Sequence, residues 1–312
     1  MGKLADILNH RFLFITGKGG VGRTTLTAAL ARASAARGRR TLVATAHSAG
    51  ALSSLLGTPV DCVIRNVAPN LDALAVDPRD SRNEYGRMIL KFEPLYRAVF
   101  ESAWVNRFLD AVPGLSEWAV LGKVTYHALE SDYRTVIFDG PPTGHALAML
   151  RLPGLISHAV LTGRLHLEAQ KRTALFLDPD RSCFVLVASP DELAAREAME
   201  AADVLQNDLG FPPPLLVINM VTRNPFEPAE EEMVASFPDH GEGSTHVTMG
   251  KARLHRCRRE QRIISELVAR FPSRHTQVLQ RPDLSVGPED LDAMMESLDK
   301  EKVDRKSAEE QD

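Results

Sequence analysis

One stretch near the start of this 312-residue chain limits its fold more than any other, residues 11–25, RFLFITGKGGVGRTT. Its apolar residues Phe12 to Ile15 predict a strand that is buried on both faces. The glycines between Gly17 and Gly22 allow a tight loop whose backbone N–H groups point at an anion. Good helix formers begin at Thr24, so the same anion would face a helix N-terminus. The stretch therefore predicts a strand, an anion-binding loop and a helix in succession.

The spacing Gly17-x-x-x-x-Gly22, followed by Thr24, is that of a phosphate-binding P-loop whose threonine hydroxyl is placed for Mg²⁺. Arg23 departs from the motif, which has lysine at that position. A structural turn rich in glycine is the alternative, but the flanking strand and helix favour a nucleotide site. The expected contacts to ATP are Gly17, Lys18, Gly19, Gly20, Val21, Gly22, Arg23, Thr24 and Thr25.

Further short apolar runs predict a mainly parallel sheet. The run Thr41–Ala44 follows the first strand by about thirty residues, which is the length of a strand–helix–strand unit. The expected fold class is therefore α/β, a P-loop NTPase sheet flanked by helices. Later apolar runs predict strands at 71–76, 136–138, 183–188, 215–218 and 277–279.

Two polar residues follow predicted strands on the edge where ligands gather in parallel sheets. Asp139 ends the strand 136–138 and is placed to bind Mg²⁺ opposite Thr24. Asn219 follows the strand 215–218, and its amide is able to recognise an adenine edge. A turn-capping role is the alternative for Asn219.

Residues 77–130 carry aromatic and methionine residues at helical spacing, which predicts an inserted helical subdomain. The sequence leaves open whether this segment forms its own closed core or a hydrophobic groove for a partner. We expect a single P-loop ATPase domain over residues 1–298. The almost wholly charged tail, 299–312, is predicted to be disordered.

Proline, glycine and capping residues indicate the boundaries of the remaining elements. Residues 140–145, GPPTGH, predict a loop of fixed and hinged parts, and Pro153–Gly154 predicts a break in the apolar stretch 151–166. A helix is expected over 191–209, capped by Ser189 and with Pro190 in its first turn. A closing helix is expected over 288–298.

Composition excludes several classes of protein. The net charge of −4 gives no footprint for nucleic acid, and the basic run 251–262 predicts a solvated helix face. The N-terminus has no apolar core long enough for a signal peptide, and no window is long enough for a membrane helix. Sparse, scattered cysteines suit a reducing compartment. We therefore expect a soluble cytoplasmic protein that neither binds nucleic acid nor inserts into a membrane.

Together these stretches resemble the ArsA family of ATPases over nearly the whole chain. Lys18 matches the extra lysine of the family's deviant P-loop, and Asp139–His145 matches its second switch, DTAPTGH, at five of seven positions. Asn219 matches the family's adenine-reading asparagine. Three shorter stretches are also similar to family elements, namely 112–117, 189–193, and Pro282 with Asp283 and Gly287, the final nucleotide loop.

The resemblance implies a dimer with ATP at the subunit interface. Lys18 would then reach the partner's phosphates, so Lys18 and Asp139 become the expected catalytic residues, and Thr24 with Asp139 would hold Mg²⁺. The resemblance also implies a helical or membrane-protein client. It makes Asn219 and Pro282 further nucleotide contacts.

Two departures from the family bear on catalysis. Arg23 is a planar fork where the family has a compact lysine. Ala44 aligns with the first-switch aspartate that orients the attacking water, and alanine cannot do so; His47 is the only titratable group left there. We expect nucleotide binding with weak hydrolysis, either in a homodimer or in a heterodimer with a paralogue whose site Lys18 completes.

Other readings of the sequence are weaker or remain open. A non-catalytic nucleotide-sensing subunit is the main alternative. A MinD- or ParA-like positioning ATPase shares the P-loop, but the switch sequence and the helical insertion oppose it. Cys62, Cys183 and Cys257 are too scattered to suggest the zinc, metalloid or iron–sulfur sites of related proteins.

Overall fold

A computed structural model of the chain describes residues 4–81, 114–237, 244–271, 275–279 and 290–291. Within these residues lies an eight-stranded sheet of order β3-β4-β2-β5-β1-β6-β7-β8. All neighbouring strands are parallel except β3 and β4. The strands are β1 (Phe12–Gly17), β2 (Thr41–Thr45), β3 (Arg65–Ala68), β4 (Leu71–Ala75), β5 (Thr135–Asp139), β6 (Ser182–Ala188), β7 (Leu215–Val221) and β8 (His275–Leu279).

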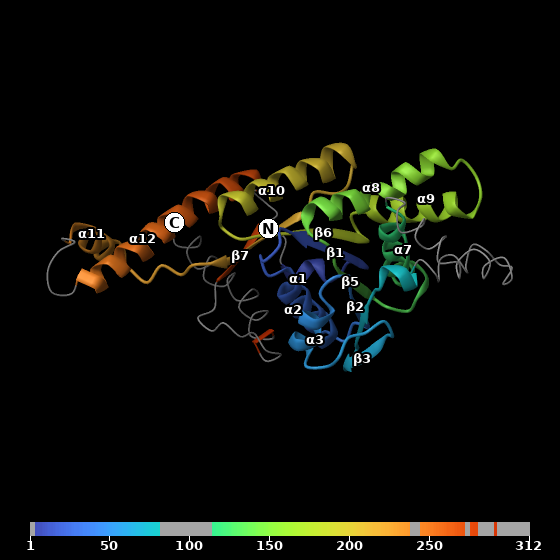
Figure 1. The fold of residues 1–312 in the computed structure, drawn as a ribbon, viewed down its shortest axis with the longest axis horizontal. Coiled ribbons are helices and arrows are strands. Elements are labelled where there is room, and N and C mark those ends of the chain that lie inside the picture. Colours follow the sequence, from blue (N-terminus) through green and yellow to red (C-terminus); the bar gives the residue numbers. More distant parts are fainter. Residues whose placement is uncertain (1–3, 82–113, 238–243, 272–274, 280–289, 292–312) are drawn as a thin grey trace, which may run out of the picture.

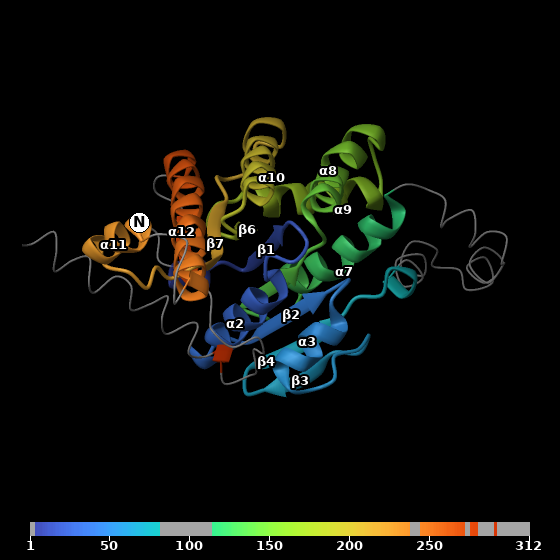
Figure 2. The same cartoon turned by 60° about the vertical axis from the view of Figure 1, so that its left-hand side comes forward.

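Helices cover both faces of this sheet, which confirms the expected α/β class (Figure 1). Figure 2 shows α2 and α3 on one side and α8, α9, α10 and α12 on the other. The helices are α1 (Leu4–Ile7), α2 (Arg23–Ala36), α3 (Ala49–Leu56), α7 (Leu115–Glu130), α8 (Thr143–Ala159), α9 (Arg164–Leu177), α10 (Glu192–Asp203), α11 (Pro228–Ser236) and α12 (Ser244–Arg270).

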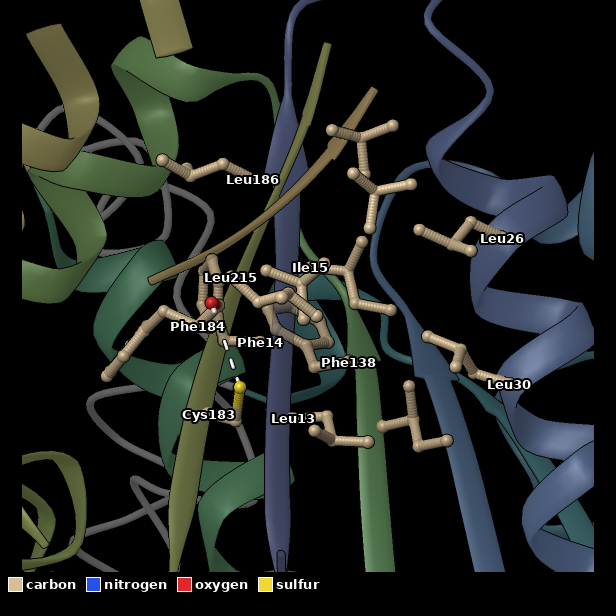
Figure 3. Close-up of a cluster of buried hydrophobic side chains, with 14 of the residues drawn as sticks. Leu13, Phe14, Ile15, Leu26, Leu30, Phe138, Cys183, Phe184, Leu186 and Leu215 are labelled. Atoms are coloured by element: carbon tan, nitrogen blue, oxygen red, sulfur yellow. Dashed lines mark hydrogen bonds between the residues drawn. The ribbon is translucent and has the colours of Figure 1, made fainter. Parts of the chain in front are cut away.

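The two faces of the sheet are packed with different kinds of side chain. Leu26 and Leu30 of α2 point toward the central strands, where Figure 3 shows them beside the sheet. On the opposite face the ring of Phe12 stacks on Phe176 of α9 at 5.7 Å, and Phe14 meets Phe138 edge to face. Strands buried on both faces need apolar residues at every position, which explains the continuous apolar runs.

Helix α8 corrects two sequence expectations. It begins at Thr143 and continues through Pro153 and Gly154, so the predicted break there is wrong. The predicted loop is also too long, because residues 143–145 form the helix's first turn. A proline inside a helix removes one backbone hydrogen bond, but Pro153, Met149 and Leu150 are buried, and this packing maintains the helix.

The boundaries of three further elements also differ from expectation. Asp191, not Ser189, caps α10 by accepting a hydrogen bond from the Ala194 N–H at 2.9 Å, and residues 204–208 form a π-helical turn. Strand β7 extends to Val221, so Asn219 lies within it. The short antiparallel strand β3 was not expected, because its exposed sequence lacks an apolar run.

Several expectations fall outside the described residues. Most of the predicted helical subdomain at 77–130 lies in residues 82–113, and only α7 represents its C-terminal part. Pro282, the final nucleotide loop, nearly all of the closing helix and the charged tail are likewise outside. Among the described helices, none is both long and apolar enough to cross a membrane.

Candidate nucleotide-binding site

The P-loop connects the carboxyl end of β1 to α2, at the sheet edge where the sequence predicted it. Gly17 allows β1 to lie against β6, since a Cβ there would be 2.1 Å from the Val187 carbonyl oxygen. Gly22 precedes α2 with φ +85°, a conformation that glycine adopts without strain. Gly19 and Gly20 are exposed with open space around them. The loop therefore leaves its backbone accessible to an anion at the start of α2.

Asn219 is the long-range support of this loop. Its side-chain Nδ2 donates to the carbonyl oxygen of Val21 at 2.8 Å, and the residue is 6% exposed. A Cβ on Gly22 would lie 2.3 Å from that Nδ2 atom, so Gly22 also makes room for the amide. In this structure Asn219 positions the P-loop; its predicted role in recognising adenine stays a prediction.

Asp139 places a carboxylate directly beside the P-loop threonine. Thr24 Oγ1 donates to its Oδ2 atom at 2.9 Å, and Thr45 Oγ1 donates to the same atom at 3.2 Å. The residue is 1% exposed. Burial raises the pKa of Asp139 above the ordinary 3.8, although the Thr24 hydrogen bond and the Arg23 charge oppose that shift.

The second oxygen of Asp139 makes this a fitting place for Mg²⁺. Its Oδ1 atom is buried and has no hydrogen-bond partner among the residues that the structure describes. Such an orphaned acceptor is costly unless a ligand satisfies it. A carboxylate and a hydroxyl are oxygen ligands of the kind that Mg²⁺ prefers, with phosphates and water completing its shell. Thr24 and Asp139 thus lie together as the sequence predicted.

Arg23 is turned to the second switch. Its Nη1 atom donates to the carbonyl oxygen of Gly140, directly after Asp139. Burial lowers the pKa of Arg23, while the charge of Asp139 opposes this change. Gly140 itself is held close to β1, because its N–H donates to Ile15 at 2.9 Å and a Cβ there would collide with Phe14. Arg23 therefore ties the P-loop to a tightly packed switch.

Ala44 lies on the sheet face opposite the carboxylate. Along a strand, successive side chains alternate between faces. Ala44 is in register with Phe138, whereas its neighbour Thr45 is in register with Asp139 and bonds to it. The Ala44 methyl is fully buried. The position that aligns with the family's water-orienting aspartate thus contributes to the core and holds no polar group.

Lys18 pairs within its own chain. Its Nζ atom lies 4.0 Å from Oδ1 of Asp191, the residue that caps α10. Burial raises the pKa of Asp191, but the hydrogen bonds from Ser189 and Ala194 and the charge of Lys18 outweigh it, so the pKa is lowered overall. The side chain of Lys18 is 31% exposed, which leaves it accessible from outside the chain.

Three further polar side chains face the switches. His47 follows β2, and burial together with the charges of Arg23 and His145 lowers its pKa, against the charges of Asp139 and Glu117. These shifts place His145 of α8 and Glu117 of α7 in the electrostatic surroundings of His47. The contacts that sequence reasoning missed are the bond from Thr45 to Asp139 and the bond from Arg23 to Gly140, although Thr45 ends β2 and Gly140 directly follows β5. Their position at this edge of the sheet could have indicated that both residues lie beside the site.

Comparison with known proteins agrees with this geometry. A family model described as anion-transporting ATPase, ArsA_ATPase, matches residues 10–166. A Halobacterium salinarum protein with the provisional name of arsenical pump-driving ATPase is 32% identical over 70% of this chain and 36% of its own length. The arsenical pump-driving ATPase of Acidiphilium multivorum is 28% identical over 72% of this chain and 41% of its own. ATPase ASNA1 homolog 2 of Paramecium tetraurelia is 29% identical over 49% and 48%.

This chain spans less than half of the length of each of these three relatives. The matched residues 10–166 nevertheless include the P-loop, β2 with its first switch, Asp139 and the start of α8. The chain belongs to the ArsA family of anion-transporting ATPases.

Proposed function

We propose that the chain is an ATPase that binds Mg²⁺–ATP at the carboxyl edge of its sheet and hydrolyses it slowly. The observation that carries the proposal is the Asp139 carboxylate, which is buried, bonded to Thr24, and left with one unsatisfied oxygen. A bound divalent cation would satisfy that oxygen and offset the burial of the charge. The family membership supports the same activity, since its members bear ATPase names.

Each part of the site has a separate role in this proposal. The backbone N–H groups of Gly17–Gly22 and the N-terminus of α2 bind the phosphates. Thr24 and Asp139 hold Mg²⁺, which supplies neutralisation of phosphate charge when bound. Asn219 keeps the loop in shape through Val21. We also infer that Asn219 meets the adenine, since it matches the family's adenine-reading residue.

Slow hydrolysis follows from two positions. The Arg23 guanidinium donates a hydrogen bond to the Gly140 carbonyl oxygen, so the side chain would have to break that bond to reach a phosphate. Ala44 offers no group to orient water and faces the core. Losing such groups costs roughly a hundred-fold or more in rate per group.

A second candidate function is a nucleotide-sensing subunit that completes the active site of a paralogue. The exposure of Lys18 favours it, because the side chain is accessible and needs only to leave Asp191 to reach a partner. In this case the chain forms a heterodimer, whereas a self-sufficient ATPase would form a homodimer. Either dimer would couple nucleotide binding to a helical or membrane-protein client, and we place the protein in the cytoplasm.

The deciding experiment measures Mg²⁺–ATP binding and steady-state hydrolysis on the purified chain, with Lys18→Ala for comparison. The proposal expects binding that Mg²⁺ strengthens, with slow turnover. Turnover that requires Lys18 supports a self-sufficient homodimer, and binding without turnover supports the sensing subunit. Absence of nucleotide binding would overturn both.

A matched control separates loss of Lys18 from loss of any surface lysine. Lys171 is suitable, since it is also a partly exposed lysine paired with a carboxylate, Glu130 at 3.1 Å. It lies on α9, outside the P-loop. Lys171→Ala should bind and hydrolyse ATP as the unaltered chain does.

A further inference from the structure

An arginine stands immediately before each of four neighbouring parallel strands. Arg40 precedes β2, Arg134 precedes β5, Arg11 precedes β1 and Arg181 precedes β6. These strands are adjacent in the order β2-β5-β1-β6. Since parallel strands begin at the same edge and neighbours lie about 4.8 Å apart, the four arginines follow one another along the amino edge of the sheet.

Backbone hydrogen bonds confirm that these residues are neighbours in space. The N–H of Arg11 donates to the carbonyl oxygen of Arg181 at 2.9 Å, and the N–H of Arg134 donates to that of Arg40 at 2.8 Å. Arg39 joins them, because its Nη2 atom donates to the Arg134 carbonyl at 3.3 Å. We call Arg11, Arg39, Arg40, Arg134 and Arg181 the arginine row.

Helix ends explain part of the row. Cations are favoured near helix C-termini, and α7 ends at this edge. Arg11 donates from Nε to Ala128 and from Nη2 to Ser131, at the end of α7. Arg39 donates to Asn9 and to the Thr135 hydroxyl. These two arginines therefore have structural roles that require no ligand.

Arg134 and Arg181 have no such role. Within the described part of the chain, neither guanidinium has a hydrogen-bond or ion-pair partner. Three carboxylates lie near the row: Asp132 pairs with Arg40 at 3.8 Å, Asp180 lines the cavity, and Asp178 accepts the N–H of Asp180 at 2.9 Å on a side-chain oxygen. The row thus concentrates positive charge on a chain whose net charge is −4.

The arginines also repel one another. Burial lowers the pKa of Arg11, and the charges of Arg181 and Arg134 lower it further, with only Asp132 opposing. Burial and the charge of Arg134 lower the pKa of Arg39 in the same way. Like charges held together without matching carboxylates are stabilised when an anion binds between them.

A cavity of about 420 Å³ lies in this cluster. That volume is in the range of small-molecule sites. Three of the five arginines of the row line it, at the edge of the sheet opposite the P-loop. The lining residues are Asn9, Arg11, Gly38, Arg39, Arg134 and Asp180.

We propose that the arginine row is a second anion site, which binds the phosphate group of a ligand at the amino edge of the sheet. Arg134 lines the cavity beside Arg11 and Arg39, and a guanidinium can donate two hydrogen bonds to the oxygens of one phosphate. A phosphate carries more charge than a single carboxylate, which suits the excess of the five arginines over Asp132, Asp178 and Asp180. The phosphate can belong to a soluble molecule or to a lipid headgroup.

The test uses the full chain and two probes that represent those sources. Pyrophosphate binding is measured by titration calorimetry, and vesicle binding by co-sedimentation with phosphatidylcholine vesicles with and without phosphatidylglycerol. The variants are Arg134→Gln and Arg181→Gln, whose side chains make no hydrogen bonds to the residues that the structure describes, so the fold should survive. Arg262→Gln is the control, because it removes one exposed arginine from α12, a helix that contributes no residue to the row or to the lining of the cavity.

We expect each row variant to weaken binding by about ten-fold or more, while Arg262→Gln binds as the unaltered chain does. Arg134→Gln removes a charge that lines the cavity, and Arg181→Gln removes one that acts on Arg11 in its lining. Loss of pyrophosphate binding alone identifies a soluble phosphate, and loss of vesicle binding alone identifies a lipid headgroup. If pyrophosphate binds only at the P-loop, neither row variant will change its affinity. The proposal is overturned if both row variants leave pyrophosphate affinity unchanged and the chain does not bind the vesicles. It is also overturned if all three variants, the control included, lose binding equally.

Discussion

The carboxyl and amino edges of the same sheet present positive charge from different groups. At the carboxyl edge, glycine-rich backbone and helix N-termini supply partial positive charge, and one carboxylate, Asp139, is buried among hydroxyl donors. At the amino edge, full positive charges gather on arginine side chains, two of which have no internal partner in the described part of the chain.

The difference follows from the polarity of parallel strands. All strands in the centre of the sheet point the same way, so helix N-termini collect at one edge and helix C-termini at the other. The first edge favours an anion held by backbone, which is independent of side-chain identity. The second favours cationic side chains, which cap carbonyl groups and, once in excess, attract anions.

The largest effect is expected at position 23. Arg23→Lys removes the guanidinium bond to Gly140 and places a compact ammonium in the P-loop. We expect ATP hydrolysis to rise by roughly a hundred-fold, the scale of one electrostatic group in a phosphate site. Steady-state kinetics would check this, and an unchanged rate would show that Arg23 is not what limits turnover.

Ala44→Asp makes a sharp contrast with that change. The new carboxylate would be buried beside Phe138, on the face opposite Asp139. An unpaired buried charge costs several kcal/mol. We expect a fall of about 3 kcal/mol in the free energy of unfolding and no gain in rate, measured by denaturant unfolding and the same kinetic assay. A stable, faster variant would show that residue 44 can reach the nucleotide.

The next effect separates binding from stability at Asp139. Asp139→Asn keeps the shape but removes the charge, so Mg²⁺-dependent ATP affinity should fall by roughly ten- to hundred-fold. The nucleotide-free protein should melt at a higher temperature, because burial raises the pKa of this carboxylate and the ionised form is disfavoured.

The contribution of Asp139 to the stability of the fold should depend on pH, with a sign set by its raised pKa. A carboxylate with a raised pKa contributes stability that is fully present below 3.8 and is lost as the pH rises through its folded-state pKa. Thermal melts of both proteins across this range should therefore diverge as the pH rises. Parallel curves would mean that the Asp139 carboxylate is solvated in solution.

The local features of both edges were predictable from sequence, while their partners were not. Phe12–Ile15 predicts β1 because its residues are apolar at every position, and the P-loop spacing is likewise local. The proximity of Thr24 to Asp139 was predictable because the P-loop and the carboxyl end of β5 share an edge, whereas their binding of Mg²⁺ stays a prediction. The bond from Arg23 to Gly140 joins residues 117 positions apart, and no local pattern encodes it.

Tertiary packing also explains the errors. Pro153 predicts a helix break by its own chemistry, but burial against neighbouring elements maintains α8. Ser189 and Asp191 are both good caps, and only the backbone geometry selects Asp191. The arginines of the amino edge are visible in the sequence, but their proximity depends on the strand order, which places β5 and β1 between β2 and β6.

A moderate effect is expected from Asn219→Ala. The change leaves the buried Val21 carbonyl without its 2.8 Å donor, which costs about 1–3 kcal/mol in unfolding free energy. We expect nucleotide affinity to fall as the P-loop loosens, measured by calorimetry. Asn224→Ala is the control, since that asparagine bonds an exposed carboxylate of Glu231. Equal losses in both variants would rule out a specific role in holding the loop.

The smallest effect tests whether the Arg23 charge is felt beyond its carbonyl partner. Burial is the main reason that the pKa of His47 lies below 6.5, and the Arg23 charge is the next. Arg23→Gln should therefore raise the His47 pKa toward 6.5, followed by NMR titration of the imidazole, while Arg151→Gln on α8 should leave it unchanged. Because the folded-state pKa is depressed, His47 contributes stability above pH 6.5 that is lost as the pH falls through that pKa. The Arg23 variant should lose less stability over this range, and an unshifted titration would confine the influence of Arg23 to the Gly140 contact.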